Sequence, residues 1–172
     1  MKQHVNPFDY AGQICQSMKK GILLTTKAGE KVNTMTIGWG TIGIEWGKPV
    51  FVAYVRESRH TRTMLDENGE FTVNIPMAEV DRNILGYCGT KSGRDADKIA
   101  DLGLTLEAPE VITVPGIRQL PLTLECKVIF RNVQDESRLP EAIRDRYYSA
   151  INAKDYHIAY YGEIVSAYII TE

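Results

Sequence analysis

One stretch of strict two-residue alternation constrains the fold of this chain more than any other feature. Within residues 120–133, apolar side chains fall on alternate positions, and the positions between them are mainly polar. Successive side chains of a β-strand point to opposite faces of a sheet, whereas a helix repeats about every 3.6 residues. The stretch therefore predicts one long strand with a single buried face. That face would carry Leu122, Leu124, Cys126, Val128 and Phe130.

Shorter strand signals, separated by glycine- and proline-containing turns, occupy much of the remaining chain. The additional strands expected are 21–26, 32–40, 42–45, 49–55, 70–75 and 157–171. The expected helices are 61–68, 78–86, 95–102 and 140–149. Gly69 is expected to end the first helix, and Ser92 with Asp95 resembles a capping box at the start of the third.

These helices are inserted irregularly among the strands. Regular alternation of strands and helices would indicate a doubly wound parallel sheet, whereas the present order favours a β-barrel with helices at its periphery. No repeat, low-complexity tract or linker divides the chain, and 172 residues suit one domain. The prediction is a mainly β single domain over residues 1–172 with peripheral helices.

Charge and cysteine content argue against several classes of function. The chain has 20 Lys and Arg residues against 22 Asp and Glu residues, a balance that argues against nucleic-acid binding. Three cysteines without a C-x-x-C pair indicate neither a disulfide framework nor a zinc site, and they favour a reduced, cytoplasmic setting. The N-terminus has no apolar signal core, and no apolar run approaches the roughly 20 residues that span a bilayer. We therefore expect no membrane association and no metal site.

Cationic and hydroxyl side chains cluster where one expected strand passes into the next helix. The first N–H groups of a helix have no intrahelical partner, and the helix dipole favours negative charge there. The cluster therefore predicts an anion site, with a phosphate as the expected ligand. The alternative is a solvated charged turn in which Ser58 or Thr61 is an ordinary N-cap. The cluster consists of Arg56, Ser58, Arg59, His60, Thr61 and Arg62.

Three further segments could contribute to a ligand site. Residues 33–40 place two glycines among polar side chains in an expected strand, which suits either a bulge or contact with a flat heteroaromatic ring. Residues 88–95 read as a glycine-rich loop that leads into a helix, without the spacing of a Walker phosphate loop. His157 begins the last expected strand, where a lone histidine is either a hydrogen-bonded structural residue or a catalyst.

Motifs of hydrolases and metal enzymes are absent from the sequence. The chain has no G-x-S-x-G, no H-E-x-x-H and only three histidines. We therefore expect the chemistry to belong to a cofactor, for which the protein supplies position and polarisation.

Taken together, these segments resemble the flavin reductase-like proteins of the FMN-binding split-barrel superfamily, in particular the flavoredoxin-type branch. The resemblance covers residues 12–171, and the motifs follow one another in the order of the family. They are N-T-M-T-I-G-W-G, Y-V-R-E-S-R-H-T, F-T-V-N-I-P, C-G-T-K-S-G-R-D-A-D-K and H-I-A-Y-Y-G-E-I-V. The resemblance implies a homodimer of six-stranded split barrels, each of which binds FMN non-covalently near the dimer interface.

The resemblance also implies the residues of the site. Those along the isoalloxazine ring would be Asn33, Thr34, Met35 and Thr36, with Tyr54, Val55 and Arg56 at its other polar edge. Those that hold the phosphate would be Ser58, Arg59, His60 and Thr61, and those that close over the phosphate or ribityl end would be Cys88, Ser92, Arg94 and Lys98. His157 matches a family histidine near the flavin or the nicotinamide. Here Lys154-Asp155-Tyr156 precedes it, where family members often have Gly-Asp-His.

The resulting interpretation is an FMN-dependent oxidoreductase. NAD(P)H would deliver hydride to the flavin, and a second acceptor such as free flavin, a ferric chelate, a quinone or a redox protein would take the electrons. The sequence favours neither NADH nor NADPH, because no ribose-reading motif is present. One alternative is a flavoredoxin-type electron-transfer protein with little nicotinamide activity, and another is a non-catalytic module that binds a different phosphorylated ligand in the same anion site.

Overall fold

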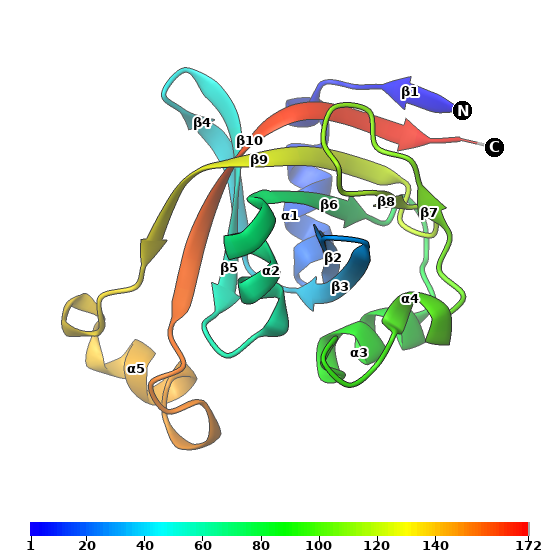
Figure 1. The fold of residues 1–172 in the computed structure, drawn as a ribbon. Coiled ribbons are helices and arrows are strands. Elements are labelled where there is room, and N and C mark those ends of the chain that lie inside the picture. The colour runs from blue at the N-terminus through cyan, green and yellow to red at the C-terminus, as the bar shows by residue number, and fades with distance from the viewer. Residues whose placement is uncertain (172) are drawn as a thin grey trace.

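The computed structural model describes residues 1–171 and is built around one strongly curved antiparallel sheet (Figure 1). Its strands are β1 (Lys2–His4), β2 (Ile22–Ala28), β3 (Lys31–Ile37), β4 (Gly40–Glu45), β5 (Lys48–Arg56), β6 (Glu70–Ile75), β9 (Leu122–Val133) and β10 (His157–Ile170). The short pair β7 (Leu106–Glu107) and β8 (Gly116–Ile117) forms a second sheet. The α-helices are α1 (Ala11–Met18), α2 (His60–Asn68), α3 (Arg82–Thr90), α4 (Lys98–Asp101) and α5 (Glu141–Tyr147).

The main sheet follows the hydrogen-bonded order β3-β2-β6-β9-β10-β5-β4, and β1 pairs with β10. Its inner face carries apolar residues in register, such as Leu24 opposite Val73 and Val73 opposite Leu124, all of them fully buried. Ile14 and Met18 of α1 pack into the same core. The predicted class, mainly β with peripheral helices, is confirmed. The main sheet has eight strands, where the strand signals predicted seven and the resemblance implied a six-stranded barrel, and the additional strand is β1, whose polar sequence gives no strand signal.

The outer face of the sheet is also buried over part of its area. Leu23 packs there in a second apolar cluster with Ile84 and Cys88 of α3. Polar residues on this face are satisfied by one another, since Thr25 Oγ1 donates to Asn74 Oδ1 (3.0 Å) and Asn74 Nδ2 donates to Thr123 Oγ1 (3.2 Å). Burial on both faces explains why the first three residues of β2 are all apolar rather than alternating with polar residues.

Helix starts differ from expectation wherever an aspartate provides the cap. α3 begins at Arg82, not at 78, because the Asp81 side chain accepts from Asn83 N–H (2.9 Å). Asp97 caps α4 in the same way, so the prediction of a capping box at Ser92 was wrong. The Ser92 hydroxyl accepts from Arg94 N–H (3.2 Å) within the loop. Helix α2 and its end at Gly69 are confirmed, and Gly69 has φ of 65°, a left-handed conformation suited to glycine.

The ends of β9 and β10 reach beyond the core and carry the segment that contains α5, which lies apart from the other helices (Figure 1). This end of β9 is largely exposed from Lys127 onward. Within residues 1–171, no helix has the length and apolar character needed to cross a membrane.

Candidate functional site

The junction between β5 and α2 is where the candidate site begins. β5 ends at Arg56, and α2 begins at His60 after a turn in which Arg59 N–H donates to Arg56 O (3.0 Å). Arg59 is the N-cap residue of α2, and its side chain makes no capping hydrogen bond. The first N–H groups of α2 therefore lack a side-chain cap, and they add positive potential to that of the nearby cations.

A pocket of about 120 Å³ lies at this helix start and is called the anion pocket below. It brings β3, the β5–α2 junction, the end of α3 and the segment 91–98 together. The predicted site residues that line it are Asn33, Met35, Thr36, Ser58, Arg59, His60, Thr61, Cys88, Ser92, Arg94 and Lys98. Segments far apart in the sequence therefore meet around one space, as the combined motifs predicted.

The walls of the anion pocket are held by contacts between β3, α2 and the loop at Gly93. Asn33 Nδ2 donates to Thr61 Oγ1 (3.1 Å), and Lys31 Nζ donates to Gly93 O (2.7 Å). A Cβ added at Gly93 would lie 2.2 Å from Asn33 Oδ1. The loop can approach β3 this closely only because Gly93 has no side chain.

The anion pocket concentrates positive charge. Lys98 is only 4% exposed, burial lowers its pKa, and its Nζ donates to Cys88 O (3.2 Å). Burial lowers the pKa of His60, and the charges of Lys31, Arg94 and Lys98 lower it further. Within residues 1–171, the buried His60 Nε2 has no hydrogen-bond partner. A buried cation, the exposed Arg59 and Arg94 at the same pocket, and an unpartnered ring nitrogen fit an anionic ligand with several oxygen atoms.

Cys88 lines the anion pocket without offering a reactive thiolate. Its side chain is buried, and burial raises the pKa of the thiol to about 11, although the nearby Lys98 opposes the shift. The thiol is therefore protonated at neutral pH and contributes packing rather than nucleophilic chemistry.

Arg56 and Ser58 are engaged by the segment that precedes β10. Arg56 donates to Asp155 O (2.8 Å) and Tyr147 O (3.1 Å). Ser58 N–H and Oγ–H both donate to the Asp155 carboxylate (3.0 and 2.7 Å). The Ser58 hydroxyl is thus engaged by a carboxylate, although Ser58 lines the anion pocket, and its contact with a phosphate stays a prediction.

A neighbouring pocket of about 180 Å³ shares Met35, Thr36 and Arg59 with the anion pocket and is called the aromatic pocket. Its remaining walls come from the end of β3 and its connection to β4, the end of β5 and the start of β10. These residues are Ile37, Gly38, Trp39, Tyr54, Arg56 and His157. Tyr54, Arg56 and His157 were predicted site residues, and the structure brings them together here rather than around the anion pocket.

His157 is held in one tautomer by a chain of hydrogen bonds. Gln134 Oε1 accepts from the backbone N–H of His157 (3.1 Å) and from Tyr148 Oη–H (2.7 Å). Since Tyr148 has only one proton to donate, its oxygen accepts from His157 Nδ1, which lies 2.7 Å away. Burial lowers the pKa of His157 to about 4, so the ring is neutral at pH 7. Its proton is therefore on Nδ1, and Nε2 carries a free lone pair.

Two predicted ring contacts point elsewhere. Thr34 is fully buried, and its hydroxyl pairs with Thr25 (3.0 Å) because strand alternation turns it away from Asn33 and Met35. Val55 is fully buried in the inner core. Neither side chain faces the pockets described here, so the predicted place of these two residues beside a ring would rest on their backbone atoms.

Trp39 is the main residue of the site that the sequence prediction omitted. Its ring lies 4.9 Å from the His157 ring and 5.1 Å from the Tyr147 ring, between centroids. The position of Trp39 between two glycines was the only signal in the sequence, and in the structure its side chain is 41% exposed. Tyr148 and Gln134 were also omitted, because only the tertiary fold brings them to His157.

Comparisons with known proteins agree with this architecture. The model of the flavin reductase like domain matches residues 17–172. An uncharacterized protein of Archaeoglobus fulgidus is 32% identical over 100 residues, which are 58% of this chain and 55% of that protein. The chain therefore spans little more than half the length of this curated relative.

Two solved structures show the same fold. A flavoredoxin from Methanosarcina acetivorans has a TM-score of 0.64 and 26% sequence identity, over 87% of this chain and 68% of that chain. An FMN-binding domain of a flavin reductase-like enzyme from Shewanella baltica OS155 has a TM-score of 0.64 and 17% identity, over 98% of this chain and 77% of that chain. The predicted resemblance is confirmed, and the chain belongs to the family of flavin reductase like domains.

Proposed function

We propose that the chain binds FMN and acts as an oxidoreductase that takes hydride from a nicotinamide dinucleotide and passes electrons to a second acceptor. When bound, FMN supplies the hydride and electron transfer itself. The observation that carries the proposal is the continuity of two pockets, one cationic and one aromatic, through Met35, Thr36 and Arg59. The family assignment and the FMN-binding neighbour support FMN in particular.

The anion pocket offers the groups that a phosphate requires. Arg59, Arg94 and Lys98 supply charge-assisted donors, and His60 Nε2 is available as a further donor in the tautomer that carries its proton there. Asn33 and Thr61 bond to each other across the pocket and keep its walls in register. We assign these residues to the phosphate end of the cofactor.

The aromatic pocket would take the ring end. Met35, Tyr54 and Trp39 provide apolar and aromatic surface, while Thr36 Oγ1 is fixed by its donation to Leu85 O (2.7 Å). His157 Nε2 is an acceptor in this pocket, because Tyr148 and Gln134 hold the proton on Nδ1. We assign to His157 the binding and orientation of a donor group on the ring or on the incoming substrate.

Anaerobic reduction tests this function. FMN-loaded protein is mixed with NADH or NADPH in a stopped-flow instrument, and the flavin absorbance near 450 nm is followed, the region in which oxidised flavins absorb. The proposal expects rapid bleaching by at least one nicotinamide and return of the colour when an acceptor is added. Slow bleaching by both nicotinamides, no faster than that of free FMN, would contradict the oxidoreductase assignment.

Electron transfer without nicotinamide activity is the second candidate, and the 26% identical flavoredoxin favours it. On that alternative the bound flavin is reduced by dithionite or a reduced redox protein while both nicotinamides fail. A chain that retained no flavin at all would instead be a module for another phosphorylated ligand. The same stopped-flow series separates the three cases.

We also propose a homodimer, as the family resemblance implies, and two tyrosines of β10 are unavailable to its interface. Tyr160 and Tyr168 of β10 lie in the core, where their hydroxyls donate to Asp66 (2.9 Å) and Glu125 (3.0 Å). An exposed apolar surface is formed by the cluster of Trp46, Phe130 and Tyr161. Ile44, which is 73% exposed, lies in β4, the strand that ends just before the turn at Trp46. Sedimentation at micromolar concentration tests the proposal, which expects a mass near twice 19.3 kDa.

Two further proposals concern the domain organisation and the location of the protein. We propose that residues 1–172 act as a single domain and work in the reducing cytoplasm, which suits the three free thiols of Cys15, Cys88 and Cys126.

A further inference from the structure

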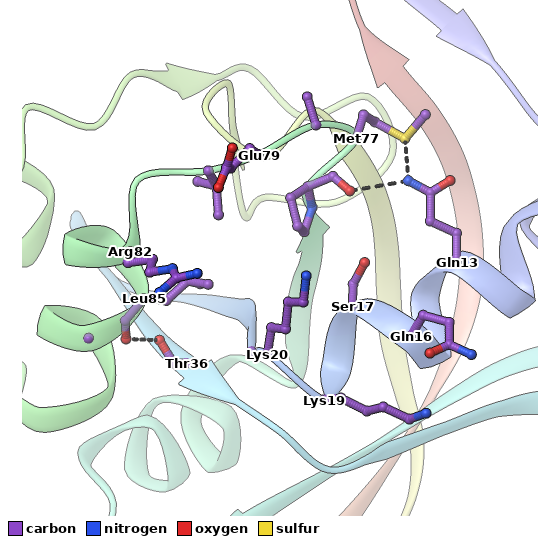
Figure 2. Close-up of a pocket in the computed structure, with 15 residues that line it drawn as sticks. Gln13, Gln16, Ser17, Lys19, Lys20, Thr36, Met77, Glu79, Arg82 and Leu85 are labelled. Carbon is purple, nitrogen blue, oxygen red and sulfur yellow. Dashed lines mark hydrogen bonds between the residues drawn. The ribbon is translucent and has the colours of Figure 1, made fainter.

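A larger cavity of about 760 Å³ adjoins the anion pocket at Thr36 (Figure 2). It lies between α1, the segment 76–80 and α3, and it is called the side cavity below. Thr36 Oγ1 donates to Leu85 O (2.7 Å), and this bond joins β3 to α3 at the boundary of the two spaces. The proposed flavin chemistry uses none of the remaining residues that surround the side cavity.

The walls of the side cavity are mainly apolar, and its rim is polar. Gln13 Nε2 donates to Pro76 O (3.2 Å) and lies 3.3 Å from Met77 Sδ, which ties α1 to the segment 76–80. Figure 2 shows these contacts at the edge of the space. The apolar lining consists of Pro76, Met77, Ala78, Val80 and Leu85. A volume of this size with mostly apolar walls is typical of small-molecule sites.

Positive charge at the rim is not neutralised by the protein. Lys19, Lys20 and Arg82 line the side cavity, against one carboxylate, Glu79. Among residues 1–171, no carboxylate oxygen lies within 4.0 Å of these three cations. In Figure 2, Lys20 and Arg82 extend into the space between α1 and α3, while Lys19 points away from it. Lys20 and Arg82 are therefore the cations available to a ligand there.

Gly86 leaves one wall of the side cavity open. It lies within α3, and an added Cβ would meet no heavy atom within 4 Å. Because an added Cβ would meet no obstacle, packing does not require a glycine at this position. Glycine also weakens a helix relative to alanine, so helix stability does not favour it either. A side chain at position 86 would instead occupy space beside Leu85.

We propose that the side cavity binds a small organic anion with a flat apolar body, such as an aromatic carboxylate or sulfonate. The apolar walls would receive the body of the molecule, and Lys20 and Arg82 would pair with the acid group. Thr36 is the one residue that the side cavity shares with the anion pocket and the aromatic pocket, so the contacts proposed here do not rest on the flavin function proposed above.

Two matched dyes test the proposal on the flavin-free protein. 8-Anilinonaphthalene-1-sulfonate is an anionic probe whose fluorescence rises in apolar surroundings, and N-phenyl-1-naphthylamine is the same framework without the sulfonate. The titrations contain inorganic phosphate, which competes for the anion pocket. The variants are Lys20→Ala, Arg82→Ala and Gly86→Trp, with Lys127→Ala on the exposed part of β9 as a charge-matched control.

The proposal expects one site for the anionic dye and weaker binding of the uncharged dye. Lys20→Ala and Arg82→Ala should each weaken the anionic dye by roughly tenfold, as expected for loss of a charge-assisted contact, and Lys127→Ala should not change it. Gly86→Trp should abolish the binding of both dyes while circular dichroism and FMN affinity stay at wild-type values.

Two results would overturn the inference. Unchanged affinity for the anionic dye in Lys20→Ala and Arg82→Ala would place the dye on another surface, such as the exposed cluster at Trp46. Equal affinity for the two dyes would mean that the side cavity does not select anions. If Gly86→Trp fails to fold, Ala78→Phe on the opposite wall replaces it, and wild-type dye binding in that folded variant would equally contradict the proposal.

Discussion

Lys98 is the residue on which we expect the preference for a phosphate-bearing flavin to depend most directly. Its side chain is nearly inaccessible, burial lowers its pKa, and its hydrogen bond to Cys88 O does not neutralise its charge. A buried ammonium group is unfavourable unless a counter-charge joins it. Lys98→Met keeps the volume and removes the charge. It should reduce FMN affinity by about 1.5–3 kcal/mol, the range for a hydrogen bond to a charged group.

The same substitution should leave two other quantities unchanged or improved. Riboflavin affinity should stay within about twofold, because riboflavin has no phosphate to lose a contact. The melting temperature of the flavin-free protein should not fall, since a buried charge has been removed. Flavin fluorescence titrations and thermal melts measure both. An equal loss of affinity for the two flavins would show that Lys98 supports the fold of the pocket rather than the phosphate.

Tyr148 controls the proton of His157. Tyr148→Phe removes the oxygen that accepts from Nδ1, so the ring would lose its single tautomer and its fixed orientation. Flavin reduction should slow by roughly tenfold, because misplacement of reacting groups lowers the rate steeply. FMN affinity should remain near the wild-type value. The control is Tyr147→Phe, whose ring contacts Trp39 and lies outside the His157 hydrogen-bond chain. Stopped-flow rates per bound flavin that match in both variants would remove Tyr148 from this role.

Acid should destabilise the protein partly through His157. Burial holds the pKa of His157 at about 4 in the folded protein, whereas an unperturbed histidine titrates near 6.5. The unfolded chain therefore binds this proton more readily between those two values. The stability that neutral His157 preserves is fully present above about pH 6.5 and is lost as the pH falls towards 4, by about 3 kcal/mol in all. Urea unfolding at pH 7 and pH 4 should show a smaller loss for His157→Gln than for wild type. The same loss in both proteins would contradict the assignment.

At the scale of elements, the loop at Gly93 determines whether the anion pocket can form. A Cβ at this position would lie 2.2 Å from Asn33 Oδ1, and Asn33 cannot move freely because it also donates to Thr61. Gly93→Ala should displace the loop from β3 and weaken FMN binding by roughly tenfold or more, with little change in the rest of the sheet. Gly86→Ala on α3 is the matched control, since its Cβ would meet nothing within 4 Å. Isothermal titration with FMN compares the two, and equal affinities would refute the close approach.

Strands and one helix could be predicted because their signals are local. Alternation in β9 and the glycine after α2 depend only on neighbouring residues, and the strand and the helix end that they predict are both present. The single buried face predicted for β9 is wrong, because Thr123 and Glu125 on its other face are fully buried and Phe130 is 46% exposed. The starts of α3 and α4 were misjudged because several polar residues compete as caps, and only the three-dimensional fold selects Asp81 and Asp97.

The candidate site divides in the same way. The cations at the β5–α2 junction are adjacent in sequence, so an anion site could be inferred from charge alone. Arg56 and Ser58 could not be separated from the others, because Asp155 lies about a hundred positions away and engages both of them only in the fold. Trp39 could not be assigned to the site from the sequence, because an aromatic residue in a strand-like segment usually indicates a buried core position rather than the exposed wall of a pocket.

At the scale of the whole molecule, the curved sheet supplies a core on its inner face and leaves ligand sites at its margin. The anion pocket and the aromatic pocket share residues of β3 and of the β5–α2 junction, and the side cavity lies along the first half of α3, whose end lines the anion pocket. In this layout, the barrel-like core holds the strands in place. The loops and the helix ends provide the charged side chains of the ligand sites.

The comparison of FMN with riboflavin tests the central claim most directly. Both flavins are titrated into the purified flavin-free protein under identical conditions, and the two dissociation constants are compared. The account predicts that FMN binds at least about a hundredfold more tightly, since two or more charge-assisted contacts to phosphate are worth roughly 3 kcal/mol together. Equal affinities for FMN and riboflavin would contradict the assignment of the anion pocket to the cofactor phosphate.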